Sequence, residues 1–278
     1  MWSQPSVLFP ADREAGISYH CAPTPSLVAS DGHLYRAFEQ SPGYSALMIR
    51  TKQPLSRIGP AGIMNAQNWE ATPYVTLTRS MIPHTWGPHW IAWQEGNAVE
   101  GPDGTIFNFL RIDGQSAQAH NKAAVLQVVE RGGNFTLDFL RMIDFPSTSS
   151  KFVIRRSPTD GLYYSLTNDV TAGALATGNI GARNHLVLAV SGTSPLSNWT
   201  VCKTILLDDT GFSTALDSAR FTGFHYVDWV FDNDDIVFAI RTGYRGSNSY
   251  HNANRLTTKR LPQYARACND GQAWRRGV

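Results

Sequence analysis

The sequence has 278 residues and a net charge of +2, with 42% hydrophobic, 11% aromatic and 17% charged residues. This composition excludes a disordered chain, and because no stretch concentrates Lys and Arg, it also excludes a nucleic-acid surface. No window reaches the ~18 apolar residues of a membrane span, and the length favours a repeat architecture over a single apolar core.

The N-terminal residues lack the charged-then-apolar layout of a signal peptide, which leaves the cellular location open. We expect a secreted or periplasmic protein if the given sequence lacks its natural N-terminus. The three cysteines, Cys21, Cys202 and Cys268, are odd in number and have no metal-type spacing. We therefore expect no disulfide framework, no metal site and no cofactor, and we expect a monomer.

Four segments each contain an alternating apolar strand, a turn and a returning strand: Pro25–Glu39, Glu95–Asp113, Lys151–Asn168 and His225–Thr242. Their turns lie at Asp31-Gly32, Asp103-Gly104, Asp160-Gly161 and Asp234-Asp235. Asp-Gly between alternating strands is the strongest short hairpin signal, because glycine accepts the positive φ that such turns require. The pattern predicts four copies of one hairpin.

Each hairpin is followed by a third apolar strand, at Ser45–Thr51, Lys122–Val129, Asn184–Val190 and Tyr250–Thr258. Fourth strands are expected at Glu70–Leu77, Phe135–Leu140 and Thr200–Leu207, and Trp2-Ser3-Gln4-Pro5 resembles the entry to another. Helical periodicity is weak, with one helical turn at most over Asp217–Phe221. Sandwiches seldom repeat one hairpin four times, so we expect a β-propeller rather than a β-sandwich.

The predicted fold class is all-β, a β-propeller of four-stranded antiparallel blades. About five blades are expected, or a shortened version of a six- or seven-bladed ring. We expect a single domain over residues 1–278, with blade units at roughly 16–80, 90–145, 150–208 and 222–262.

Several fragments resemble the sialidase-superfamily propellers, whose blades carry Asp-box turns. Ser191–Trp199 resembles a degenerate Asp-box turn, and Lys151–Arg155 leading to Gly161–Asn168 resembles the blade pattern of bacterial and fungal sialidase-like proteins. Trp93–Gly104, and Arg241–Tyr244 running to His251–Asn254, are similar to the same group. The resemblance spans about Gly16 to Leu261 and implies an exo-acting glycosidase or a lyase of uronic-acid polysaccharides. The N-terminal arginine motif and the acidic Asp of true sialidases are not visible.

Blade geometry selects candidate site residues. In a four-stranded blade, the starts of strands one and three share an end with the finish of strand two. The polar residues at these positions are His20, Glu95, Asn97, Lys151 and His225 with Asp228; Arg36, Glu39, Arg111, Asn168 and Arg241; and His120, Asn121, Arg183, Asn184, Tyr250 and His251. We expect them to converge on one mouth.

Three arginines at comparable positions, Arg111, Arg183 and Arg241, suit a carboxylate because each planar guanidinium donates two parallel hydrogen bonds. Asn97, Lys151 and Trp93 are expected to bind the same substrate, with Trp86 and Trp90 close to Trp93 in sequence. The catalytic candidates are Glu95, His20, His251 and Tyr244. A tyrosine nucleophile requires a cation that lowers its pKa. Each candidate also has a structural alternative. Glu95 would be an ion-pair partner of an arginine, His20 and His251 would be hydrogen-bonded structural histidines, and Tyr244 would form part of an aromatic wall.

Three functions follow, all with an oligo- or polysaccharide as partner. The first is an exo-acting glycoside hydrolase on a sialic or uronic acid, with Glu95 and either Tyr244 or His251 as the catalytic pair. The second is a polysaccharide lyase, in which His20 or His251 removes a proton and Tyr244 donates one. The third is a propeller that binds carbohydrate without cleaving it.

Overall fold

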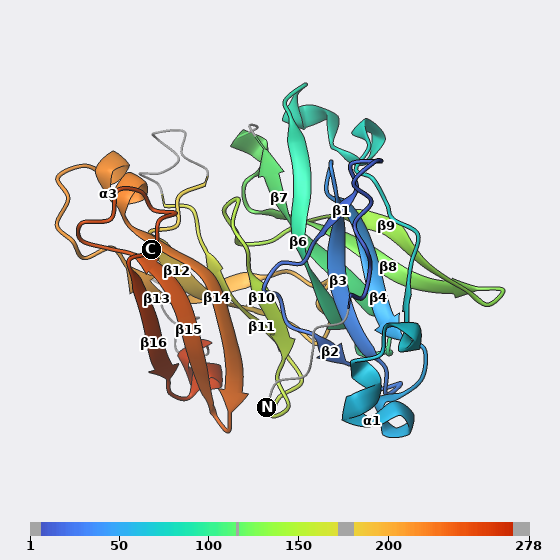
Figure 1. Cartoon of the computed structure of the whole chain (residues 1–278). Coiled ribbons are helices and arrows are strands. Elements are labelled where there is room, and N and C mark those ends of the chain that lie inside the picture. The colour runs from blue at the N-terminus through green and yellow to red at the C-terminus, as the bar shows by residue number, and fades with distance from the viewer. Residues whose placement is uncertain (1–6, 115–116, 172–180, 269–278) are drawn as a thin grey trace. The chain divides into compact units, whose positions relative to one another are not determined.

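A computed structural model describes residues 7–114, 117–171 and 181–268. The described chain is dominated by antiparallel strands in four sheets, which confirms the all-β propeller class with four blades, close to the five expected (Figure 1). The N-terminal strand expected at residues 2–5 lies outside the described residues. The chain divides into two compact units. Unit 1 comprises residues up to Ile82, Ala92–Leu110 and Ala124–Arg141, and unit 2 comprises Pro83–Ile91, Arg111–Ala123 and the residues from Met142 onward.

The strands follow the predicted repeat. The first sheet has β1 (Ser18–His20), β2 (Leu27–Val28), β3 (Leu34–Ser41), β4 (Ser45–Thr51) and β5 (Trp69–Ala71), in the order β1-β3-β4-β5 with β2 also paired to β3. The second has β6 (Ile91–Glu100), β7 (Ile106–Gly114), β8 (Lys122–Arg131) and β9 (Asn134–Asp144), in chain order. The third has β10 (Val153–Arg156), β11 (Tyr163–Asn168), β12 (His185–Ser191) and β13 (Thr200–Leu207), and the fourth has β14 (Gly223–Asp232), β15 (Asp235–Gly243) and β16 (Arg255–Leu261), each in chain order.

Three of the four predicted turns are made by one recurring set of contacts, and the fourth has Asn233 with φ of 54° in place of a glycine. The carboxylates of Asp31, Asp103 and Asp160 each accept the backbone N–H two residues on, at 2.9–3.1 Å. The glycine that follows each of them has φ between 72° and 83°, a conformation that a side chain disfavours. Tyr35 donates its hydroxyl to Asp31 at 2.7 Å, and Tyr164 does the same to Asp160 at 2.8 Å. Burial, aided by the Asp31 carboxylate, raises the pKa of Tyr35 to about 12.

Helices are short and few in the described chain: α1 (Leu55–Ile63), α3 (Ala215–Phe221) and the 3-10 turns η1 (Ala66–Asn68), η2 (Arg79–Met81), η3 (His84–Trp86) and η4 (Ala117–Ala119). The sequence analysis missed α1, because Gly59 and Pro60 interrupt its helical pattern. It placed only a turn at α3, whose Thr214 cap accepts the Asp217 N–H at 3.0 Å. The strand expected from Tyr250 begins instead at Arg255, so Tyr250 and His251 stand in the connection before β16.

The core of unit 2 is a cluster of inward-facing side chains from β10–β12, β14–β16 and the C-terminal turn, centred on Trp229, Phe238 and Tyr264. Cys202 of β13 and Cys268 form a disulfide across 66 residues. The expectation of no disulfide was therefore wrong for this pair, and Cys21 accounts for the odd count as a free, exposed cysteine. The number and spacing of cysteines in the sequence cannot identify a pair that only the folded chain brings together.

Candidate functional site

The three arginines predicted to hold a carboxylate all lie in unit 2 and share their neighbours. Arg111 donates from Nη1 to the carbonyl oxygen of Ser149 at 3.1 Å, and Arg183 donates from Nη2 to the same oxygen at 3.4 Å. The guanidinium carbons of Arg183 and Arg241 lie 5.8 and 5.1 Å from the ring centre of Tyr226. Arg111 and Arg183 are buried, and Arg241 is exposed. We call Arg111, Arg183, His225, Tyr226, Arg241 and His251 the arginine cluster.

His225 is the buried histidine of the arginine cluster, and its imidazole is neutral. It is 1% exposed, and its ring stacks on that of His251 with centroids 5.6 Å apart and planes inclined by 6°. Burial lowers the pKa of His225 to about 3, with further lowering from Arg183, Arg241 and His251 and a small opposing effect from the Tyr250 backbone. The imidazole is therefore uncharged at neutral pH, and it adds no cation to those already present.

Tyr226 is the cluster residue that the sequence analysis did not identify. It lies on β14 with φ of 56°, where the register with β15 shifts between His225 and Asp228. A non-glycine residue in this region costs of order 1–2 kcal/mol, and such strain is found where function requires it. The sequence carries no signal for it, because Tyr gives no hint of a positive φ.

Lys151, predicted to bind substrate, has a different position. It is 2% exposed, and its ammonium donates to the carbonyl oxygen of Val227 at 2.6 Å. Val227 directly follows Tyr226, so this bond holds the peptide between Val227 and Asp228, one residue beyond the strained position. The geometry makes Lys151 a positioning residue for the cluster.

His251 and Tyr244 differ in their relation to the cluster. His251 is exposed, and its ring lies 6.4 Å from that of Tyr226 and 6.3 Å from that of Tyr250. Tyr244 donates its hydroxyl to the Asp209 carboxylate, which raises the pKa of Tyr244 although Arg255 lies 4.3 Å from its ring centre. A nucleophilic role required the opposite shift, so the structure favours the alternative of an aromatic wall for Tyr244.

In unit 1, two buried glutamates meet at one peptide. Glu95 is 2% exposed and has φ of 58° in β6, and the N–H of the next residue, Gly96, donates to Glu39 Oε1 at 2.8 Å. Glu39 is 1% exposed, and its Oε2 pairs with His20 Nδ1 at 2.8 Å. A Cβ at Gly96 would lie 2.2 Å from Asn108 Oδ1, so only glycine fits there. Glu39 thus pairs with His20 and accepts the N–H of the residue after Glu95; the sequence analysis expected Glu39 at the mouth but gave it no catalytic role.

Asn97 and Trp93 are the other predicted residues in unit 1, and both are buried. The Asn97 amide donates to the carbonyl oxygen of Glu95 at 3.3 Å, so Asn97 contacts the residue of β6 that has positive φ. The Trp93 indole is 0% exposed, donates to the carbonyl oxygen of Tyr44 at 3.0 Å and packs against Phe139. This placement leaves no face for a sugar ring, and a core role replaces the stacking role expected of Trp93. Of the two neighbouring tryptophans, Trp86 is buried and Trp90 is 56% exposed.

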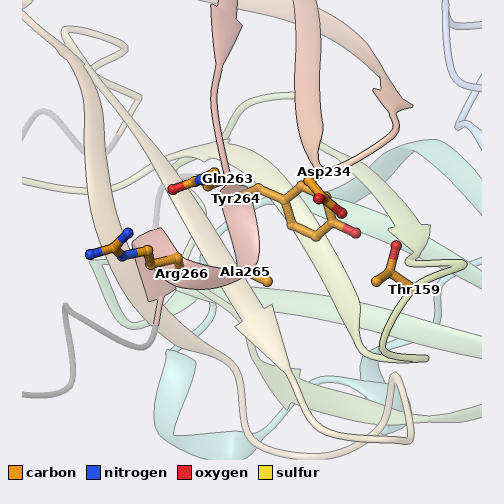
Figure 2. A pocket seen from close by; sticks show the side chains of 6 residues that line it. All are labelled: Thr159, Asp234, Gln263, Tyr264, Ala265 and Arg266. Atoms are coloured by element: carbon orange, nitrogen blue, oxygen red, sulfur yellow. The ribbon is translucent and has the colours of Figure 1, made fainter.

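One cavity of about 250 Å³ lies in unit 2 at the turns of the last two hairpins, lined by Thr159, Asp234, Gln263, Tyr264, Ala265 and Arg266 (Figure 2). Tyr264 reaches from the C-terminal turn and shares a hydrogen bond of 2.8 Å with the Ser157 hydroxyl. This cavity is at the turn end of β14 and β15, whereas His225 and Arg241 lie at the other end of the same strands. It is therefore distinct from the arginine cluster.

Within the described ranges, no group of three or more His, Cys, Asp or Glu side chains is placed to hold a metal ion. A membrane-spanning helix, long and apolar enough to cross a bilayer, is not found in the same residues.

No protein-family model and no curated protein sequence matches the chain. The fold is similar to that of an exo-β-1,3-galactanase from Phanerochaete chrysosporium solved with galactose (TM-score 0.51, 9% identity, 82% of this chain and 44% of that one). It is also similar to a B. megaterium levansucrase mutant (TM-score 0.50, 10% identity, 88% of this chain and 65% of that one). The NanB sialidase from Streptococcus pneumoniae aligns with a TM-score of 0.46 at 15% identity, over 85% of this chain and 30% of that one. This chain spans about half the length of the first solved structures it matches, and at such identities the likeness concerns the fold alone.

Proposed function

We propose that this chain is a carbohydrate-active propeller that takes an acidic glycan and holds the carboxylate of a sialic or uronic acid residue at the arginine cluster. The observation that carries the proposal is the grouping of Arg111, Arg183 and Arg241 around Ser149 and Tyr226. Arg111 pairs with the Asp113 carboxylate at 3.3 Å. A bound anion offsets the repulsion among the neighbouring guanidinium groups of the cluster. A carboxylate matches the guanidinium geometry.

The comparisons support the same class of partner. Two structures of similar fold are named as an exo-β-1,3-galactanase and a levansucrase, which are enzymes acting on carbohydrate. Those names concern the other proteins, and the charge of the arginine cluster is what directs our proposal towards an acidic sugar.

The chemistry that unit 2 supports best is β-elimination of a uronate. An arginine that neutralises the carboxylate acidifies the C5–H bond, and the exposed His251 imidazole accepts that proton. The C4–O bond then breaks as a C4=C5 double bond forms, and the departing oxygen takes a proton from a tyrosine hydroxyl. Tyr226 and Tyr250, whose rings neighbour His251, replace Tyr244 in this role. The ring stacked on His251 is the neutral imidazole of His225.

Hydrolysis remains a second candidate because unit 1 supplies the two carboxylates that it needs. Glu95 and Glu39 are both buried and adjoin the same Gly96 peptide. Glycoside hydrolysis uses a pair of carboxyl groups that flank the scissile bond. In this mechanism Glu95 is the catalytic residue, and exo-action on the end of an acidic glycan is the expected mode.

The test begins with binding of glucuronic acid and N-acetylneuraminic acid, measured by calorimetry. Arg241→Gln should weaken binding of the acid by about tenfold or more, as expected when a charged hydrogen-bond donor is lost. The control is Arg255→Gln, which removes an exposed arginine lying over Tyr244 and should leave affinity unchanged. No binding of either acid, or equal effects of the two variants, would overturn the proposal.

The two chemistries are separated by their products on uronate oligosaccharides. Elimination creates an unsaturated uronate that absorbs in the near ultraviolet, whereas hydrolysis creates new reducing ends without that absorbance. Glu95→Gln should abolish hydrolysis and spare elimination, and His251→Gln should abolish elimination. Binding without either product would assign the chain to carbohydrate recognition alone and remove both catalytic roles.

A further inference from the structure

A second cavity of unit 2, about 290 Å³ in volume, has a lining that the arginine cluster does not use. We call it the Trp199 groove, and it is lined by Asn121, Asp144, Phe145, Pro146, Asp169, Trp199 and Val201. Asn121 precedes β8, Asp144 ends β9 and Asp169 follows β11. In antiparallel sheets, the starts of third strands share an end with the finishes of second and fourth strands. The groove therefore opens at the end of these strands where Arg183 precedes β12.

One wall of the groove is a fixed aromatic ring. The Trp199 indole donates to the carbonyl oxygen of Pro195 at 3.0 Å, which sets its orientation. Phe145 meets it edge to face with centroids 4.9 Å apart, and Phe145 in turn packs on Phe152 at 4.3 Å. The indole is only partly buried, so apolar surface remains for the C–H face of a sugar ring.

The polar lining consists mainly of acceptors. Asp144 and Asp169 bring carboxylates, and Asp144 also pairs with Lys122. The buried Oδ1 of Asn121 has no hydrogen-bond partner among the described residues. Such a set matches ligand hydroxyl groups, which donate, and it repels a carboxylate. The groove therefore favours a neutral sugar, in contrast to the cationic cluster.

A short buried segment, Ser147–Ser150, connects the groove to the arginine cluster. The carbonyl oxygen of Ser147 accepts the Asn121 N–H at 2.8 Å, and that of Ser149 accepts from Arg111 and Arg183. All four residues of the segment are less than 9% exposed. Two residues of chain span at most about 7 Å, so both sites are built on carbonyls two residues apart in one backbone segment.

We propose that the Trp199 groove binds a neutral, hydroxyl-rich sugar residue next to the acidic one, so that the substrate is a mixed glycan rather than a polymer of uronate alone. This inference rests on the proposed function of the arginine cluster. It adds the identity of the neighbouring residue, which the cluster by itself does not specify.

The test compares an acidic monosaccharide, a neutral monosaccharide and a disaccharide that joins the two, by calorimetry and tryptophan fluorescence. Asn121 has φ of 54°, so Asn121→Gly removes the amide without disfavouring the backbone. The matched control is Asn233→Gly, because Asn233 also has φ of 54° and lies in the turn after β14. Asn121→Gly and Asp169→Asn should each weaken the disaccharide by about tenfold and leave the acidic monosaccharide unchanged.

The outcomes separate the two proposals. If the disaccharide binds no more tightly than the acid alone, or if Asn121→Gly behaves as Asn233→Gly does, the groove is not a sugar site and the arginine cluster keeps its role. If the neutral sugar binds and quenches fluorescence while no acid binds, the proposed function fails and the neutral site stands alone. Binding of none of the three probes overturns both.

Discussion

Units 1 and 2 each contain a strained residue in a strand, and the side chains that hold the backbone beyond it carry opposite charges. Each has a non-glycine residue with positive φ in the first strand of a sheet, Glu95 at 58° in β6 and Tyr226 at 56° in β14. In unit 1 the peptide after it is held through its N–H by the Glu39 carboxylate. In unit 2 the peptide one residue further on, between Val227 and Asp228, is held through its carbonyl oxygen by the Lys151 ammonium.

We call the Glu39 carboxylate and the Lys151 ammonium the two anchors, and they differ in the sign of the charge that each brings to its unit. In unit 1 the acceptor is the Glu39 carboxylate, a second buried carboxyl group next to the peptide that follows Glu95. In unit 2 the donor is the buried Lys151 ammonium, which brings a positive charge to the strand that carries His225 and Tyr226. Unit 1 therefore contains the buried carboxyl groups, and unit 2 the arginines, on which the two proposed chemistries depend.

The largest effect is expected from the Cys202–Cys268 disulfide. It lies in unit 2, and no disulfide is found among the described residues of unit 1. Replacing both cysteines by serine should lower the free energy of unfolding by about 4 kcal/mol, since the bond closes a long loop of 66 residues. Hydrogen exchange followed by mass spectrometry should show lost protection in β14–β16 and little change in β3 and β4. Equal losses in both regions would contradict the assignment of the bond to one unit.

The anchors themselves should differ in their tolerance of substitution. Lys151→Met leaves the Val227 carbonyl without its ammonium donor and should destabilise the protein by about 2 kcal/mol, a typical cost for a buried bond to a charged group. Glu39→Gln should cost less, because the amide oxygen still accepts the Gly96 N–H. Urea unfolding of both variants gives the comparison. A larger loss in Glu39→Gln would mean that the ion pair of Glu39 with His20 stabilises the protein more than the hydrogen bond from the Gly96 N–H does.

Unit 2 should also carry a pH dependence through His225. In the unfolded chain an imidazole takes a proton below about pH 6.5, whereas folded His225 does so only near its pKa of about 3. Stability should therefore be full at pH 7 and fall by about 1.4 kcal/mol per pH unit as pH drops below 6.5. Unfolding measured between pH 7 and 5 should show this slope in the native protein and a flatter one in His225→Phe. The same slope in both would exclude His225 as its source.

The smallest effect is expected at Tyr244, whose partners lie apart from the two anchors. The Asp209 carboxylate raises the pKa of Tyr244, so Asp209→Asn should lower it towards its ordinary value. Ultraviolet titration of the phenol checks this, with Tyr244→Phe to assign the transition. An unchanged titration in Asp209→Asn would restore the possibility of an activated tyrosine here.

The hairpins could be predicted from sequence because their cause is local. In three of the four hairpins, an aspartate that accepts the N–H two residues on and a glycine with positive φ form the turn. Arg111 and Arg241 lie near the ends of second strands and Arg183 precedes a third strand, and these positions share one end of a blade, so the repeat could predict that they approach shared neighbours. Local patterns carry that much of the site.

What the sequence could not indicate depends on distant partners. Trp93 looks the same whether its indole faces solvent or donates to Tyr44 in the core. The role of Lys151 depends on a carbonyl 76 positions away, and the strain at Tyr226 on the bulge beside it. The Cys202–Cys268 pair similarly requires the last sheet to bring its ends together.

The bond between Cys202 and Cys268 encloses every strand of the last sheet. A protease that cuts the exposed connection at Arg245 would leave His225 on one fragment and His251 on the other. The two fragments would remain joined through sulfur and would migrate as one species until a reductant separates them. Nicked protein could thus keep its histidine pair in place after the backbone between them is broken.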